Sequence, residues 1–451
     1  MNIKNKSNIN KSVVRIFAEI ISKNPFIPFD DLPPKRSQGT GFFIDNQGHI
    51  LTCAHVVDSS VNILIDIPNV STEKIKCELV YYIPEFDIAL LKTIDYKNKY
   101  FVELGNSDDL VISEQVFAVG FPKSINSNGS NNIKYTLGII SGHQEGLIQT
   151  DTPINSGNSG GPLFKGDKVI GINSKKMIGK NVSNIGYSIP INYFQNSKKE
   201  KSIIIDRPLL NCITNNTNEM MCKILSKNTS GIFISKIYDK SIFKSIKGIK
   251  DNILLTKFDD YDIDHFGYLE KRWLGEKINL KNVLNFYKNH QKVKIEYFYN
   301  KKKYSKTITL KPEREFIDYM HSNHEKIDFM IIGGAILMNL YTDHLEKVNL
   351  IKNENDLYEE KLLVSYILPN SQLNILNNID AGTFIEEVND KKVKNLDEFR
   401  KIIKKPYKLN GSKVIKLKNN NTNIILLNYD NVKKENKLLS KLYRFNTKNL
   451  I

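Results

Sequence analysis

Residues 148–164 read IQTDTPINSGNSGGPLF, and the segment from Gly157 to Gly161 at its centre decides the local fold. Ser159 lies between glycines, with Gly157 two residues before it and Gly160 directly after it. Glycines permit a tight turn where a Cβ would clash, and such a turn lets backbone N–H groups converge. The segment therefore predicts a turn that presents a serine hydroxyl beside several N–H donors. Taken alone, it also fits an ordinary loop or an anion-binding nest.

Two other short segments supply the partners that a catalytic serine needs. His55 follows an apolar run that begins at Leu51, and Asp87 enters the apolar run 88–91. Amide hydrolysis requires a nucleophile, a base that takes its proton, and a group that fixes the tautomer of the base. A lone histidine after a strand is more often a packed or surface residue, and an aspartate before a strand is commonly a turn residue. The joint order His, Asp, Ser on a β background nevertheless predicts a serine protease.

The sequence around these segments predicts an all-β domain. From residue 11 to residue 194, short apolar or alternating runs are separated by Gly, Asn and Asp, which is typical of a barrel or sandwich. Residues 1–10, rich in Asn and Lys, are expected to be disordered. The segment 23–38 contains four prolines and is not expected to join the interior of a sheet.

After about residue 203 two further β-rich regions follow each other. In the first, apolar residues at i, i+3, i+4 and i+7 predict a helix over Ile278–His290, and a hairpin follows it. The second repeats this order, with a predicted helix over Leu396–Ile403 before a closing pair of strands. In the tail, residues 432–451, four apolar side chains at helical spacing predict a packing helix: Leu438, Leu439, Leu442 and Phe445.

Composition excludes two classes of protein. Hydrophobic residues make up 40% of the 451, which is enough apolar material for sizeable cores and excludes wholesale disorder. Four cysteines are too few for a disulfide scaffold, and none forms a C-x-x-C pair, so a reducing compartment is expected. Cys53 and His55 lack the further ligands that zinc would require, and we expect no metal or other cofactor.

The formal net charge of +16, from 65 Lys and Arg against 49 Asp and Glu, raises the hypothesis of a nucleic-acid-binding protein. Residues 41–200 hold 14 basic and 16 acidic side chains, so the region of the predicted protease is close to neutral and most of the excess follows it. No aromatic-interleaved or helix-turn-helix pattern accompanies this excess. Solvated turns and helix faces explain it more simply, and we expect no specific nucleic-acid partner.

The sequence shows no membrane or export signal. The N-terminal residues lack the apolar core of a secretory signal, and no window of about 18 apolar residues occurs. The longest apolar run, Phe329–Leu340, is too short to span a bilayer. We therefore expect a soluble, intracellular protein without a membrane span, in the cytoplasm or the nucleus.

Taken together, these motifs resemble the chymotrypsin-fold serine proteases and, among them, the HtrA/Deg family. Asn158 before the serine and the segment Gly186–Pro190, read GYSIP, are typical of that family. The motifs that carry the resemblance are Gly39–Ile44, Leu51–Val57, Asp87–Leu91, Ile148–Leu163, Val169–Asn173 and Asn184–Pro190.

The resemblance implies a mainly β protein: a chymotrypsin-like double β-barrel protease domain followed by two PDZ-like α+β domains, as in plant Deg-type enzymes. The implied parts are the protease domain at 11–200, a first PDZ-like domain at 203–312, a second, degenerate one at 325–431 and a helical tail at 432–451. A PDZ domain binds a peptide by strand addition and holds its terminal carboxylate in a glycine-containing loop. The loop expected at Arg207–Asn211 lacks the usual glycine, which puts carboxylate binding in doubt, whereas Ile331–Leu337 of the second domain keeps two glycines.

The resemblance also implies roles for single residues. Ser159 would be the nucleophile, His55 the general acid and base, and Asp87 the residue that orients His55. The oxyanion hole would come from the backbone of Gly157, Asn158 and Ser159. The pocket for the side chain before the scissile bond would be lined by Ile154, Ile172, Asn173 and Ser174. No acid lies between residues 152 and 156 to receive Lys or Arg, so we expect a preference for small to medium aliphatic residues.

Enzymes of this family act without ATP or metal on unfolded or damaged proteins and usually form trimers through the N-terminal region of the barrel. The resemblance therefore implies polypeptide substrates, PDZ ligands, and a homotrimer or a multiple of trimers. Phe26 and Phe29 are candidate trimer contacts, with packing inside the chain as the alternative. A different class of function also stays open, namely a PDZ-bearing scaffold or holdase whose barrel cuts weakly or not at all.

Overall fold

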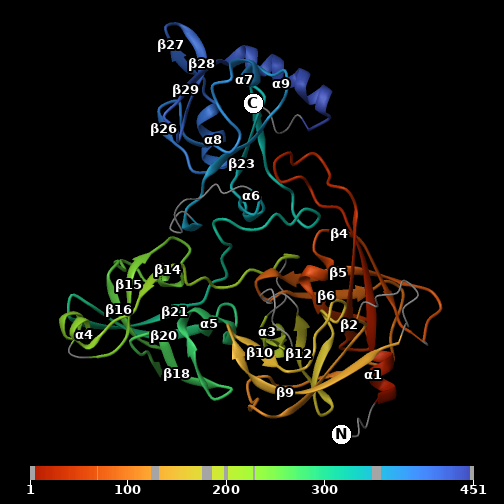
Figure 1. Ribbon diagram of the computed structural model, residues 1–451. Helices are drawn as coiled ribbons and strands as arrows, with labels where there is room; N and C mark the ends of the chain where they lie inside the picture. The colour runs from red at the N-terminus through yellow and green to blue at the C-terminus, as the bar shows by residue number, and fades with distance from the viewer. Residues whose placement is uncertain are drawn as a thin grey trace. The chain divides into compact units, whose positions relative to one another are not determined.

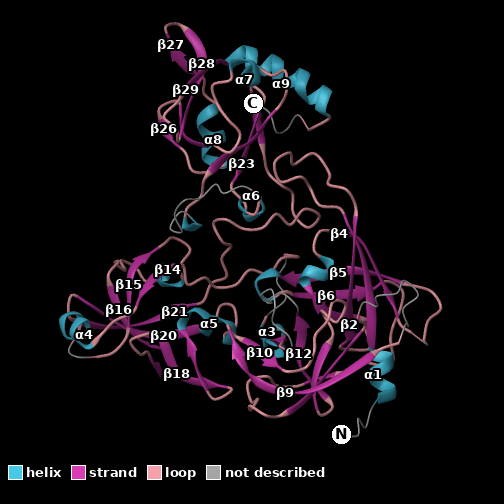
Figure 2. Cartoon of the chain, viewed as in Figure 1, coloured by secondary structure: helices cyan, strands magenta, loops and turns pink. Residues whose placement is uncertain are grey.

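The computed structural model describes residues 6–68, 70–122, 132–174, 185–197, 202–226, 229–347 and 357–446. Strands dominate the described chain, and the helices between them are short (Figure 2). Contacts divide the chain into two compact units: residues 1–20 with 35–314, and residues 21–34 with 315–451. The segment 21–34 therefore belongs to the second unit, although it lies between two barrel strands in sequence.

Six antiparallel strands close the first barrel in the order β1-β2-β3-β6-β5-β4 (Figure 1). They are β1 (Val13–Ile20), β2 (Lys35–Phe43), β3 (His49–Cys53), β4 (Ser60–Asp66), β5 (Ile75–Ile83) and β6 (Ile88–Thr93). Apolar side chains such as Phe42, Ile50 and Leu91 are fully buried in its core. β3 leads into the one-turn helix α2 (Ala54–Val57), and the 3-10 turn η1 (Pro84–Phe86) precedes β6.

One sequence prediction for this region is wrong. Disorder is predicted for residues 1–10, but helix α1 (Lys6–Ser12) forms within this range, because Ile9 packs into the barrel core. Residues 1–5 lie outside the described residues. The segment 23–38 is not expected in the interior of a sheet, and its last residues, Lys35–Gln38, pair with β1 while the pairing of β2 with β3 is confined to Phe42 and Phe43. The prolines end at Pro34, so the backbone N–H groups after it are available for strand pairing.

Seven strands form the second sheet, in the order β11-β8-β9-β10-β13-β12-β7. A further pairing of β11 with β12 closes six of them into an antiparallel barrel, and β7 pairs with β12 in parallel outside this ring. The seven strands are β7 (Glu103–Leu104), β8 (Gln115–Gly120), β9 (Lys134–Gln144), β10 (Leu147–Thr150), β11 (Pro162–Lys165), β12 (Lys168–Ser174) and β13 (Gly186–Pro190). Helix α3 (Ile191–Asn196) follows β13. Two antiparallel barrels in succession confirm the predicted chymotrypsin-like double barrel.

The first C-terminal module, defined here as residues 202–314, is built on a sheet in the order β14-β15-β16-β20-β21, with β17 paired to β16. Its strands are β14 (Cys212–Asn215), β15 (Ile232–Ile237), β16 (Ile253–Phe258), β17 (Tyr261–Asp262), β18 (Tyr268–Trp273), β19 (Glu276–Asn279), β20 (Lys292–Tyr299) and β21 (Lys302–Thr309). Its helical elements are α4 (Glu219–Leu225), η2 (Ile242–Ser245), α5 (Leu280–Val283) and η3 (Leu284–Phe286). The β20–β21 pair confirms the predicted closing hairpin.

The helix predicted over Ile278–His290 is much shorter in the structure. Strand β19 occupies its start, and Asn279 caps α5 by accepting a hydrogen bond from the N–H of Lys281. At its end, Arg207 Nη2 donates to the carbonyl oxygens of Leu284 and Tyr287, which lie 3.1 and 2.6 Å away. These carbonyl groups are therefore bound by a side chain where a longer helix would bind them to its own N–H groups.

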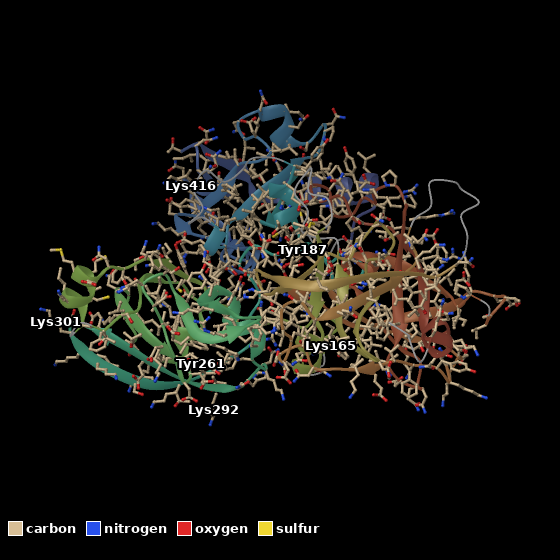
Figure 3. The ribbon with its side chains drawn as sticks, turned by 60° about the horizontal axis from the view of Figure 1, so that its bottom comes forward. Lys165, Tyr187, Tyr261, Lys292, Lys301 and Lys416 are labelled. Atoms are coloured by element: carbon tan, nitrogen blue, oxygen red, sulfur yellow. The ribbon has the colours of Figure 1, made fainter. Side chains whose placement is uncertain are left out.

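Part of the basic excess of the chain lies on the outer surface of this module. Lys292 and Lys301, at the start of β20 and in the hairpin turn, are exposed and point away from the sheet (Figure 3). Solvated lysines of this kind agree with the simpler interpretation of the charge.

The second C-terminal module, residues 315–446, contains a sheet in the order β22-β23-β24-β25-β28-β27, with β26 paired to β25 and β29 to β28. Its strands are β22 (Met330–Ile332), β23 (Ala335–Asn339), β24 (Leu362–Ile367), β25 (Phe384–Val388), β26 (Lys391–Lys392), β27 (Tyr407–Leu409), β28 (Ser412–Asn419) and β29 (Ile424–Asn428). Its helices are α6 (Thr342–Leu345), α7 (Gln372–Leu376), α8 (Leu396–Ile403) and α9 (Tyr429–Tyr443). The predicted helix over 396–403 is confirmed by α8.

The two glycines of this module form the turn between β22 and β23. Gly333 and Gly334 have φ angles of +55° and +92°, the left-handed values that a two-residue hairpin turn requires. Their carbonyl oxygens accept hydrogen bonds from the N–H groups of Leu373 and Leu368. The hairpin turn alone therefore explains why glycine stands at both positions.

The tail helix α9 buries a different face from the one the sequence predicts. Leu439 and Phe445 are buried, but Leu438 and Leu442 are 68% and 69% exposed. The buried face includes Asn436, whose side-chain Nδ2 donates to a carbonyl oxygen of β22 at 2.9 Å. Among the described residues, no helix is long and apolar enough to cross a membrane.

The segment 21–34 packs within the second unit. The ring of Phe29 lies 5.7 Å from that of Phe329 and 5.2 Å from that of Phe445. His344 Nε2 lies 2.7 Å from the carbonyl oxygen of Pro25, and its imidazole ring is 5.4 Å from that of Phe26. These contacts show packing of both phenylalanines inside the chain, and a trimer contact at them stays a prediction.

Candidate active site

The pairing of β3 with β6 brings two of the predicted catalytic residues together. Cys53 pairs with Ile88 across these strands, so α2 begins beside the residue that precedes Ile88. Asp87 Oδ2 lies 2.8 Å from His55 Nδ1, and Asp87 Oδ1 accepts a hydrogen bond of 2.9 Å from the backbone N–H of His55. The carboxylate therefore fixes the ring through Nδ1 and leaves Nε2 as the ring nitrogen for chemistry.

Asp87 is itself held by several donors. It is 4% exposed and has a φ of +56°, and its carbonyl oxygen accepts a hydrogen bond of 2.9 Å from Ala54 N–H. Ser174 Oγ donates to Asp87 Oδ2 at 2.9 Å. Donors to both carboxylate oxygens favour the ionised form. The sequence assigns Ser174 to the substrate pocket and misses this role, because only the folded barrels bring the two residues together.

The turn at Ser159 has the predicted conformation. Gly157 and Gly160 have φ angles of +98° and +86°. A Cβ on Gly160 would lie 2.2 Å from the carbonyl oxygen of Thr40 and 3.0 Å from the backbone nitrogen of Cys53, so the turn sits against β2 and the end of β3. Thr40 also binds the turn directly, because its Oγ1 donates to Gly157 O at 2.7 Å and its N–H donates to Ser159 O at 2.9 Å.

Two backbone donors of this turn are unpaired. Within the described part of the chain, no group accepts a hydrogen bond from the N–H of Gly157 or of Ser159. The N–H of Asn158 donates a hydrogen bond of 3.0 Å to the carbonyl oxygen of Asn155. The predicted set of three oxyanion donors is thus corrected to two, because the third N–H group already has an acceptor inside the turn.

The serine hydroxyl and the imidazole ring are not hydrogen-bonded to each other in this conformation. Ser159 is 5% exposed and the His55 side chain is 39% exposed, and no hydrogen bond joins them in the described ranges. Catalytic hydrogen bonds of free enzymes are often long and tighten when substrate binds. The missing hydrogen bond is therefore compatible with a catalytic role for the two residues.

The predicted pocket residues divide into two kinds. Ile154 and Ile172 are buried aliphatic side chains that can line an apolar pocket. Asn173 Nδ2 donates to Pro162 O at 3.2 Å, and its Oδ1 accepts a hydrogen bond of 2.9 Å from a serine of β13. The side chains of Asn173 and Ser174 are thus engaged inside the barrel, which corrects their placement as pocket lining. The loop that follows, residues 175–184, lies outside the described residues.

Cys53, His55 and Asp87 have atoms that could bind a metal ion within 4.8 Å of one another, a group that the sequence spacing does not reveal. His55 Nδ1 is hydrogen-bonded to Asp87. Cys53 Sγ donates a hydrogen bond of 3.3 Å to the carbonyl oxygen of Asn173. Burial, with a further contribution from the negative charge of Asp87, raises the pKa of the Cys53 thiol well above its ordinary value. The thiolate that a metal needs is therefore disfavoured.

Aromatic rings connect Asp87 to the first C-terminal module. Phe86, directly before Asp87, packs on Tyr193 of α3 with ring centroids 4.7 Å apart. Tyr193 in turn meets Phe286 of the module edge-on at 5.9 Å. The guanidinium of Arg207 lies 4.8 Å from the ring centroid of Phe86, a cation–π contact. The residue before Asp87 is thus packed between α3 and the module.

Comparisons with known proteins agree with this geometry. Residues 39–172 match the family model described as a trypsin-like peptidase domain. The chain is 26% identical over 444 residues to the putative mitochondrial protease Do-like 12 of Arabidopsis thaliana, covering 94% of this chain and 83% of the relative. It is 41% identical over 150 residues to a probable periplasmic serine endoprotease, DegP-like, of Halomonas elongata, covering 31% and 30% of the two chains. A solved HtrA-type protease with a decapeptide has a similar fold, with a TM-score of 0.52 and 23% identity over 68% of this chain and 97% of the other.

Proposed function

Because the chain belongs to the HtrA/Deg family of serine-type endopeptidases, we propose that it cleaves polypeptides through Ser159, His55 and Asp87 by an acyl-enzyme mechanism. One observation carries the proposal: the His55–Asp87 contact of 2.8 Å lies beside a glycine turn that presents a serine and two unpaired N–H groups. A nucleophile, an oriented base and oxyanion donors are the parts that this chemistry requires.

In the proposed reaction, Ser159 Oγ attacks the carbonyl carbon while its proton passes to His55 Nε2. Asp87 holds the proton on Nδ1, so Nε2 is the basic nitrogen. The N–H groups of Gly157 and Ser159 stabilise the negative charge on the carbonyl oxygen. His55 then gives its proton to the leaving amine and the C–N bond breaks. Water, deprotonated by His55, finally releases the acyl group from Ser159.

The proposed substrates are unfolded or damaged polypeptides, cut without ATP or metal. Ile154 and Ile172 support a preference for small to medium aliphatic residues before the scissile bond, because their side chains offer apolar surface and no acid for Lys or Arg. A hydrophobic pocket of this kind separates residues that differ by one methylene only about 10–200-fold. The preference is therefore expected to be graded.

The proposal includes PDZ-like domains at 203–312 and 325–431. β14 lies at the edge of the first sheet, the position where a peptide can add a strand. Asn211 in the preceding loop has a φ of +36°, so the chain makes a left-handed turn there without the usual glycine. A homotrimer is the assembly that the family resemblance favours, and light scattering of the purified chain measures it.

Cleavage of β-casein by the wild type and by Ser159→Ala tests the proposed mechanism. Loss of the nucleophile should lower kcat by about a millionfold, to the background rate. Ser156→Ala, three residues earlier in the same turn, is the matched control and should cut like the wild type. Equal cleavage by wild type and Ser159→Ala contradicts the mechanism. Binding of unfolded casein without any cleavage by the wild type would favour the scaffold.

A further inference from the structure

Thr40 of strand β2 is fully buried beside the turn that carries Ser159. Its backbone N–H donates to the carbonyl oxygen of Ser159 at 2.9 Å. Its Oγ1 donates to the carbonyl oxygen of Gly157 at 2.7 Å and accepts a hydrogen bond of 3.0 Å from the N–H of Phe121. One threonine therefore binds two peptide groups of the turn, and its hydroxyl has a partner both as a donor and as an acceptor.

The first of these peptide groups joins Gly157 to Asn158 and is held at both ends. Its carbonyl oxygen accepts the hydrogen bond from Thr40 Oγ1, and its N–H donates to the carbonyl oxygen of Asn155 at 3.0 Å. A peptide group is planar, so two bonds at opposite ends fix its orientation. Gly157 has a φ of +98° and, as a glycine, could adopt many other backbone angles. The bond from Thr40 therefore restricts the direction in which the N–H of Gly157 points.

The second peptide group joins Ser159 to Gly160 and is held in the same way. Its carbonyl oxygen accepts a hydrogen bond from the N–H of Thr40, and its N–H donates to the carbonyl oxygen of Asn173 at 2.8 Å. The N–H of Gly157 directly precedes the first held group, and the N–H of Ser159 lies between the two. Thr40 thus holds the backbone that carries both proposed oxyanion donors.

Thr40 is itself fixed by contacts with both barrels. Its carbonyl oxygen accepts a hydrogen bond of 2.8 Å from Thr52 Oγ1, three residues before His55. Phe121, which donates to its hydroxyl, directly follows strand β8 of the second barrel. The packing around the hydroxyl is tight, because a Cβ on Gly120 would lie only 3.1 Å from Thr40 Oγ1. A hydroxyl supported by strands in this way can hold a site precisely.

We propose that Thr40 is a positioning residue for the oxyanion hole: its hydroxyl group keeps the N–H of Gly157 aligned with that of Ser159. Thr40 touches no reacting atom and acts through the backbone of Gly157. Donors that are oriented before the reaction need no rearrangement when the carbonyl oxygen becomes negative. A misplacement of about 1 Å in such a site can lower the rate about 100-fold. This inference rests on the proposed protease function.

Three variants of the full chain test the role of the hydroxyl group. Thr40→Val replaces Oγ1 by a methyl group of similar size, and Thr40→Ser keeps the hydroxyl. Thr93→Val is the matched control, because Thr93 is also buried in the first barrel and its Oγ1 also donates to a backbone carbonyl oxygen, that of Tyr96. The substrates are β-casein and acetyl-Ala-Ala-Val with a fluorogenic amide, and each rate is divided by the folded fraction from circular dichroism.

Thr40→Val should lower kcat about 10- to 100-fold and change KM less than about threefold, because an oxyanion donor acts mainly in the transition state. Thr40→Ser should recover most of this loss. Thr93→Val should match the wild type within about threefold, because its hydroxyl has no bond to the turn. A residue that only stabilised the fold would lower the folded fraction in both valine variants and leave kcat per folded molecule unchanged.

A peptide aldehyde, acetyl-Ala-Ala-valinal, gives a second readout of the oxyanion hole. Its carbonyl carbon bonds to Ser159 Oγ while the hydroxyl proton passes to His55 and the negative charge moves to the aldehyde oxygen. Its inhibition constant should rise in Thr40→Val by the same factor as kcat/KM falls, because the adduct resembles the transition state.

The structure of the wild type with this aldehyde covers the case in which Thr40→Val does not fold. The aldehyde oxygen should lie about 2.7–3.1 Å from the nitrogen atoms of Gly157 and Ser159, with the bond from Thr40 Oγ1 to Gly157 intact. Loss of that bond in the complex, or an equal kcat in Thr40→Val and Thr93→Val, overturns the inference alone. Failure of the wild type to cut both substrates overturns the proposed function.

Discussion

The two C-terminal modules have a similar order of elements, with a helix before a closing pair of strands, but they hold different partners. The first belongs to the same compact unit as the barrels, and buried aromatic and cationic side chains join it to the residue before Asp87. The second holds the segment 21–34, through the ring of Phe29 and the backbone of Pro25. The first module thus packs near the catalytic residues, whereas the second packs on the segment that connects β1 and β2.

This difference shows that the contacts of a module depend on a few side chains outside its common pattern. Arg207 and Trp273 supply them in the first module, and His344 and Leu439 in the second. Substitution of such residues should act on one unit and spare the other. The predictions below follow from this expectation, and each has a measurement that reports on one unit.

The largest effect is expected at Asp87, where the contacts of the first module end. Asp87→Asn keeps the size of the side chain but replaces the acceptor of His55 Nδ1–H by an amide, which favours the wrong tautomer. We expect kcat for β-casein to fall about 10⁴-fold with little change in KM. Asp58→Asn, a nearby change outside the site, is the control. A loss below tenfold in Asp87→Asn would show that Asp87 does not orient His55.

The second effect concerns the stability of the first unit. Arg207→Ala removes the guanidinium donor from the carbonyl oxygen of Tyr287 and from Asn289 Oδ1, and one of two donors from the carbonyl oxygen of Leu284. We expect a loss of about 3–5 kcal/mol in the free energy of unfolding. Trp273 is the single tryptophan of the chain and lies in this unit, so its fluorescence in urea reports the change. Arg272→Ala removes an exposed arginine and should cost less than about 0.5 kcal/mol. Equal losses in both variants would refute a special role for Arg207.

The third effect is a pH dependence confined to the second unit. Burial lowers the pKa of His344 to about 4, and the neutral ring accepts a hydrogen bond from Tyr341 N–H at Nδ1. The unfolded chain binds this proton near pH 6.5, so the stabilisation is complete above that pH and is lost as the pH falls toward 4. The total loss is about 3 kcal/mol.

Hydrogen exchange of the β23 amides, corrected for the intrinsic pH effect, measures this dependence. His344→Gln should flatten the profile between pH 6.5 and 4, whereas His290→Gln, at an exposed histidine of the first unit, should keep it. A flat profile in the wild type would mean that burial does not hold His344 neutral.

The smallest effect separates two neighbouring leucines of α9. Leu439 is 6% exposed in a core with Phe329 and Phe445, and Leu438 is 68% exposed. Leu439→Ala should reduce the stability of the second unit by about 2–3 kcal/mol, and Leu438→Ala by less than about 0.5 kcal/mol. Hydrogen exchange of the β23 amides measures the loss of stability in both variants. A larger loss in Leu438→Ala would support the helix face that the sequence pattern predicts.

The parts of the fold that the sequence predicts are those with a local cause. A glycine turn around Ser159 and a histidine at the end of β3 follow from the chemistry of a few adjacent residues. The meeting of His55 with Asp87 depends on the β3–β6 register, which the apolar runs of both strands favour. The double barrel and the β20–β21 hairpin were predictable for the same reason.

The parts that the sequence misses depend on distant partners. Ser174 donates to Asp87 only because the two barrels meet there. The predicted helix over Ile278–His290 ends early because Arg207, far away in sequence, binds two of its carbonyl groups. In α9 the apolar spacing of Leu438 and Leu442 is real, but the sheet contacts the face that carries Asn436 and Leu439. Periodicity predicts a helix and leaves its buried face to tertiary contacts.

Labelling of the full chain with a fluorophosphonate, followed by mass spectrometry of its peptides, tests the central claim most directly. Such probes react with serine hydroxyl groups that a neighbouring base activates. The account predicts one adduct on Ser159 that disappears in Ser159→Ala and forms far more slowly in His55→Ala. Labelling of Ser159 at the same rate in His55→Ala, or no adduct on Ser159 in an enzyme that cuts casein, would contradict it.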